Sequence, residues 1–107
     1  MKEPSLAVSY AFLYPLLAEA ARSVGYALAL HGSMARDLDV VAVPWVDDAA
    51  DAETLMQALT LACDGYRLQA TCGREEPARK PHGRLSRGIL LEGPVMIDVS
   101  VMPRTGA

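Results

Sequence analysis

The chain has 107 residues, of which 51% are hydrophobic and 21% are charged, and its formal net charge at pH 7 is −3. This length predicts one small globular domain over residues 1–107, and the composition argues against a disordered chain. The net negative charge argues against binding of a polyanion by bulk electrostatics.

The first expected element is a helix over residues 6–24, which are rich in Ala and Leu and end before Gly25. Pro15 is expected to kink this helix or to restart it with the proline in the first turn. Lys2, the apolar run and Ala18-Glu19-Ala20 loosely imitate a signal peptide. Two tyrosines, a glutamate and Pro15 favour a core-facing helix instead, and the run is too short and too polar to cross a membrane.

A second helix is expected at about residues 48–63, with four acids crowding its start and Gly65 closing it. Its buried face is expected to be Leu55, Met56, Leu59 and Cys63. Residues 26–31, 38–45, 66–71, 88–92 and 95–102 are typical of strands, and the last two predict a hairpin. The order predicts an α+β fold (an α/β sandwich), in which two helices cover a mixed sheet of four to five strands.

Three aspartates predict a metal site. Asp37 and Asp39 are two residues apart at the start of a strand, so they project from one face. Asp98 shares a face with Met96 and Ser100 inside an otherwise apolar strand, where a carboxylate needs a partner. Two carboxylates ~4 Å apart repel by about 4 kcal/mol at an effective dielectric of 20. A divalent cation removes that penalty, and oxygen ligands favour Mg²⁺ or Mn²⁺.

Two structural alternatives stay open for these acids. Asp37 is also a residue that shapes tight turns. Asp98 could instead form an ion pair with Arg36 or Arg84. His31, which precedes Gly32, is interpreted as structural.

Gly32-Ser33 after an apolar strand, followed by Asp37-Leu38-Asp39 and by Asp98 on a later strand, resembles the signature of the nucleotidyltransferase superfamily (the polymerase-β-like fold). The resemblance implies that Gly32 and Ser33 hold a triphosphate. It also implies that the three aspartates are catalytic metal ligands for transfer of a nucleotide from a nucleoside triphosphate to an acceptor. The spacer of only three residues, Met34-Ala35-Arg36, favours an alternative, a catalytically inactive relative that serves as a binding or assembly module.

A Gly-, Pro- and Arg-rich loop is expected over residues 72–87. Within it Lys80, His82 and Arg84, together with Arg36, are candidates for binding nucleotide phosphates, and a merely solvated loop is the alternative. Nucleic-acid binding has weak support, because Tyr66 is the one aromatic residue near the loop.

Residues 80–84 and 97–104 are similar to small uncharacterised proteins of phages and prophages. That similarity, with Cys63 and Cys72 interpreted as two reduced thiols, predicts a protein of the bacterial cytoplasm. The sequence does not predict an oligomeric state.

Overall fold

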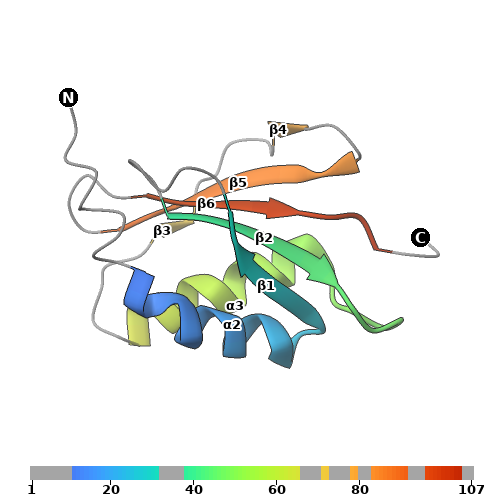
Figure 1. Ribbon diagram of the computed structural model, residues 1–107, viewed down its shortest axis with the longest axis horizontal. Coiled ribbons are helices and arrows are strands. Elements are labelled where there is room, and N and C mark those ends of the chain that lie inside the picture. The colour runs from blue at the N-terminus through green and yellow to red at the C-terminus, as the bar shows by residue number, and fades with distance from the viewer. Residues whose placement is uncertain are drawn as a thin grey trace.

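A computed structural model describes residues 11–31, 38–65, 71–72, 78–79, 83–91 and 96–104. These residues form an α+β fold in which two α-helices lie against one face of a mixed sheet (Figure 1). In chain order the elements are the 3₁₀ helix η1 (Ala11–Leu13), α2 (Tyr14–Ser23), β1 (Tyr26–Leu30), β2 (Leu38–Pro44), α3 (Ala52–Gly65), β3 (Thr71–Cys72), β4 (Ala78–Arg79), β5 (Leu85–Leu90) and β6 (Met96–Val101). The predicted fold class is confirmed.

The strand order in the sheet is β1-β2-β6-β5-β3, and the two-residue strand β4 also pairs with β5. β2 and β6 run parallel, while the other neighbouring strands are antiparallel. Four long strands therefore make the sheet, as expected, and the two short strands β3 and β4 lie along the outer edge of β5. The predicted pairing of the last two strands is confirmed by the β5–β6 register.

Helix α2 shows how a proline and a glycine set the ends of a helix. Pro15 lies in its first turn, where the missing N–H would have no helical partner. Gly25 follows the helix with φ of +94°, and a Cβ there would lie 2.7 Å from the Cα of Ala49. Glycine is therefore required at this position by both its backbone conformation and its packing. The expected restart at Pro15 and the end at Gly25 are confirmed, whereas residues 6–10 lie outside the described residues.

Helix α3 begins four residues later than the expected start at Asp48. The carboxylate of Asp51 accepts the backbone N–H of Thr54 at 2.8 Å, so Asp51 is the capping residue. Hydrogen bonds from the backbone and the side chain of Thr54 lower the pKa of the Asp51 carboxyl. The predicted start was wrong because any of the crowded acids could have supplied the cap, and only one has the geometry.

The boundaries of two expected strands also need correction. β5 begins at Leu85, three residues before the expected start at Gly88, so the loop predicted over residues 72–87 is shorter than expected. Of the strand expected at residues 66–71, residues 66–70 lie outside the described residues, and Thr71 belongs to β3.

The two faces of the sheet have different chemistry. The face toward α2 and α3 carries the buried core, including Leu38, Val40, Ile89, Ile97 and Val99. The opposite face carries no helix in the part of the chain that the structure describes (Figure 1), and we call it the open face. Its residues, placed by the alternation and register of the strands, are Ala27, Ala29, Asp39, Val41, Val43, Ser86, Gly88, Leu90, Met96, Asp98 and Ser100.

None of the described helices is long and apolar enough to span a membrane.

Candidate metal site on the open face

Asp39 and Asp98 are brought together by the one parallel strand pair of the described sheet. They are register partners on β2 and β6, and both side chains are half-buried. Register partners on neighbouring strands project from the same face, and the strands lie about 4.8 Å apart. Asp39 and Asp98 are thus far apart in the sequence but lie side by side on the open face.

This pair lies within a row that crosses four strands. The backbone N–H of His31 donates to the carbonyl of Asp39 at 3.0 Å, which extends the β1–β2 register by one residue. On the other side Gly88 of β5 is the register partner of Asp98. The row is therefore His31, Asp39, Asp98 and Gly88. His31 is exposed, and its place next to Asp39 was not anticipated because the sequence contains no signal of strand register.

Asp98 is held by a hydroxyl group from the neighbouring strand. The Oγ of Ser86 donates to Oδ1 of Asp98 at 2.8 Å. Ser86 is the diagonal neighbour of Asp98, since its own register partner is Ser100. A hydroxyl that donates to a carboxylate fixes the orientation of that carboxylate. The predicted need of Asp98 for a donor is thus met at one oxygen.

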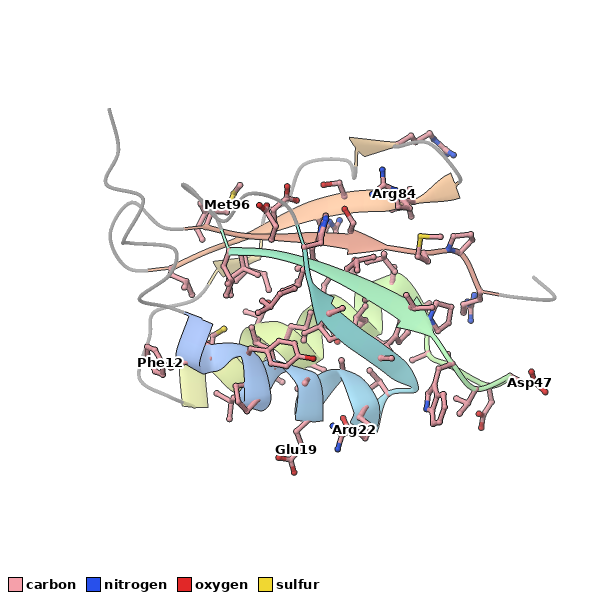
Figure 2. All side chains as sticks on the ribbon, in the orientation of Figure 1. Phe12, Glu19, Arg22, Asp47, Arg84 and Met96 are labelled. Atoms are coloured by element: carbon pink, nitrogen blue, oxygen red, sulfur yellow. The ribbon has the colours of Figure 1, made fainter. Side chains whose placement is uncertain are left out.

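Gly88 leaves the position opposite Asp98 without a side chain. A Cβ on Gly88 would lie 2.6 Å from the Sδ of Met96, so the thioether of Met96 fills that space. Met96 and Arg84 lie toward opposite ends of the β5–β6 pair (Figure 2). Toward β5, the described neighbours of Asp98 are therefore the thioether of Met96, which fills the space over Gly88, and the hydroxyl of Ser86.

The remaining predicted site residues divide into two groups. Arg84 immediately precedes β5 and is half-buried; in Figure 2 it lies beside that strand, far from Glu19 and Arg22 of α2. The others lie outside the described residues: Gly32, Ser33, Arg36, Asp37, Lys80 and His82. The structure thus brings Asp39 and Asp98 together. Asp37 is close to Asp39 in the sequence, and its position lies outside the described residues.

Arg87 corrects the expectation of one continuous basic loop. It belongs to β5, is the register partner of the buried Val99, and forms an ion pair with Glu53 of α3. Its side chain is 19% exposed, so it faces the helices and not a phosphate on the surface. Because Glu53 is mostly exposed, this pair stabilises the fold by at most about 1 kcal/mol. Arg79 lies in β4 and is exposed.

The donor chemistry of the site fits a small divalent cation. Carboxylate oxygens are the ligands that Mg²⁺ and Mn²⁺ prefer. Within the described residues no group of three His, Cys, Asp or Glu side chains is placed to hold a metal ion. The described part of the chain therefore supplies two neighbouring carboxylates, and Asp37 lies outside the described residues.

Comparisons with models of protein families, with curated proteins and with solved structures found no match to this chain.

Proposed function

We propose that the open face holds Mg²⁺ or Mn²⁺ between Asp39, Asp98 and Asp37, and that the protein is a minimal nucleotidyltransferase-like enzyme. The single observation that supports this is the register pairing of Asp39 with Asp98 on parallel neighbouring strands. The resemblance at residues 32–39 implies an acid–hydrophobic–acid triplet with a third acid on a later strand, and β6, which carries Asp98, pairs with β2. The reaction is transfer of a nucleotide from a nucleoside triphosphate to an acceptor.

Electrostatics supports a cation at this point of the surface. Two ionised carboxylates on neighbouring strands repel, and a divalent cation bound between them would remove that repulsion. The hydroxyl of Ser86 donates to one oxygen of Asp98. A bound divalent cation would supply charge neutralisation for the phosphates during transfer. In this proposal Gly32 and Ser33 contact the triphosphate, and Arg36, Lys80, His82 and Arg84 contribute positive charge or hydrogen-bond donors.

The metal site is tested by titrating the chelator-treated protein with Mn²⁺ and measuring binding by calorimetry and the melting temperature. Wild-type protein is expected to bind and to gain about 2.7 kcal/mol of stability at a free Mn²⁺ concentration 100 times the Kd. Asp39→Asn and Asp98→Asn should each abolish the shift. The matched control is Asp47→Asn, an exposed aspartate in the β2–α3 connection, which follows the end of β2 opposite to Asp39. An equal shift in all four proteins would refute the site.

The enzymatic step is tested by the bond that it must break. Nucleotide transfer cleaves between the α- and β-phosphates and releases pyrophosphate, so pyrophosphate formed from each of the four nucleoside triphosphates is measured with a panel of hydroxyl acceptors. Release that depends on Mn²⁺ and is lost in Asp39→Asn is expected. The short spacer Met34-Ala35-Arg36 favours a second candidate function, a non-catalytic binding or assembly module of phage or bacterial origin. Nucleotide binding without pyrophosphate release would support this second function.

A further inference from the structure

A cavity of about 260 Å³ lies where β6 ends, next to the first residue of α3. Its lining includes two arginines, Arg79 and Arg104, and among the described residues that line it there is no Asp or Glu. Apolar residues make up much of the rest of its wall, among them Leu85, Val101 and Pro103. The cavity thus combines two positive charges with an apolar surface.

The strand register explains why Arg79 borders this cavity. Arg79 of β4 is the register partner of Leu85 on β5, and Leu85 is the register partner of Val101 on β6. Register partners on neighbouring strands project from the same face of a sheet. The three residues therefore form a row on the face toward the helices, since Val101 belongs to the buried core. Asp39 and Asp98 belong to the open face, so this cavity is separate from the proposed metal site.

The two arginines have little opposing charge around them. Within the described residues neither Arg79 nor Arg104 forms an ion pair with a carboxylate. Arg104 donates from Nη1 to the carbonyl of Ala49 at 3.4 Å, a long contact that leaves the other donors of its guanidinium group for a ligand. The carboxylate of Asp51 is near enough to act electrostatically on Arg104, but it already caps α3. An anion in the cavity would supply the missing counter-charge.

We propose that this cavity binds a small phosphate monoester, whose phosphate is held by Arg79 and Arg104 and whose short apolar group lies against Leu85 and Val101. One guanidinium fork already matches the two oxygens of a carboxylate, whereas a phosphate monoester presents three terminal oxygens and up to two negative charges to a pair of arginines. Pockets for drug-sized ligands measure about 300–1,000 Å³. A volume of about 260 Å³ therefore limits the ligand to a smaller molecule. The site depends neither on the proposed metal site nor on the proposed transferase activity.

The experiment follows the isotope-labelled full chain by NMR while propyl phosphate, inorganic phosphate or butyrate is added at constant ionic strength. Chelator is present throughout, so that a metal ion on the open face cannot contribute. We expect saturable shifts of the backbone amide signals of Leu85 and Val101. Propyl phosphate should bind at least about 4-fold more tightly than inorganic phosphate, the effect of burying one methylene group. Butyrate has the same apolar group on a carboxylate and should bind more weakly than propyl phosphate.

Three variants with the same change of charge identify the residues that bind. Arg79→Gln and Arg104→Gln should each bind propyl phosphate about 10-fold more weakly, because each removes charged hydrogen bonds to the phosphate. The matched control is Arg22→Gln, an exposed arginine of α2 that does not line the cavity (Figure 2). It should bind within twofold of wild type. Circular dichroism shows whether each variant is folded, and Arg→Lys, which loses the planar fork, replaces a glutamine variant that is not.

The opposite results are equally clear. Absence of saturable shifts at Leu85 and Val101, or losses in Arg22→Gln equal to those in Arg79→Gln and Arg104→Gln, would overturn the site. Equal affinities for propyl phosphate and inorganic phosphate would overturn the role of the apolar wall and identify free phosphate as the ligand. Tighter binding of butyrate than of propyl phosphate would overturn the choice of a phosphate.

Discussion

The Asp39→Asn variant should be more stable than wild type without metal. In the presence of Mn²⁺ the variant should be less stable than wild type. Asparagine keeps the size of the side chain and an oxygen that can accept a hydrogen bond, but it removes one of two charges on neighbouring strands. The expected reversal in the order of stability follows from this loss. In the proposed site the second charge repels the first without metal, and the same charge would be a ligand when metal is bound.

The magnitude follows from the sheet geometry. Two charges about 5 Å apart on adjacent strands repel by about 0.8 kcal/mol at the dielectric of water and by about 3 kcal/mol at an effective dielectric of 20. Both side chains are half-buried, and Ser86 already donates to Asp98, so we expect the lower end, about 1 kcal/mol. In a chain of this size that corresponds to a rise of about 4–8 °C in the melting temperature.

The assay is thermal unfolding followed by circular dichroism, in chelator at low salt, in chelator at about 1 M salt, and in Mn²⁺. High salt shortens the Debye length to about 3 Å and should shrink the gain of Asp39→Asn. Asp47→Asn should change little in any of the three conditions. A metal-free Asp39→Asn that is less stable than wild type, with no dependence on salt, would refute the idea that the two carboxylates repel.

Three further predictions concern the scaffold. Gly25→Ala should destabilise the protein by about 2–4 kcal/mol, because the left-handed backbone and the 2.7 Å approach to the Ala49 Cα both oppose a side chain; urea unfolding should show a lower midpoint with an unchanged slope, and an unchanged midpoint would contradict the argument. Burial raises the pKa of the Cys63 thiol from 9.0 to about 11, so the contribution of this group to stability should be complete below pH 9 and be lost as the pH rises to 11; a Cys63→Ala variant should lose this pH dependence, and native Cys63 should react slowly with a thiol reagent. The pKa of Asp51 is lowered by hydrogen bonds from Thr54, so the stability from this cap should be present above the ordinary pKa of 3.8 and be lost as the pH falls below it, a dependence that Asp51→Ala should lack in acid titrations of unfolding.

Local chemistry predicted the helices well. Pro15 and Gly25 mark the start and the end of α2 because each has a backbone preference that acts within one turn. The apolar spacing of α3 predicted the buried face that Leu55, Met56, Leu59 and Cys63 form. The start of α3 was placed wrongly because capping depends on the position of one carboxylate relative to one N–H, and several acids competed for it.

The strand β5 shows a different limit of the sequence. Leu85, Ser86 and Arg87 fell within the Gly-, Pro- and Arg-rich loop expected over residues 72–87. In the structure Arg87 faces the helices and pairs with Glu53, 34 residues earlier in the chain. A charged side chain can occupy the inner face of a strand when another element supplies its partner, and no pattern within the strand reveals that partner.

The sequence by itself determined the local elements, the α+β class and the assignment of Asp98 to the face opposite Ile97 and Val99, because alternation and capping act over a few residues. It also predicted a metal site at Asp37, Asp39 and Asp98. Only the tertiary structure decided that these two residues are partners in the same row, that Ser86 holds one oxygen of Asp98, and that Arg87 belongs to the core side. The physical reason is that strand register between β2, β5 and β6 is set by burial of one whole face against α2 and α3, and a shift by one residue would move every side chain to the other face.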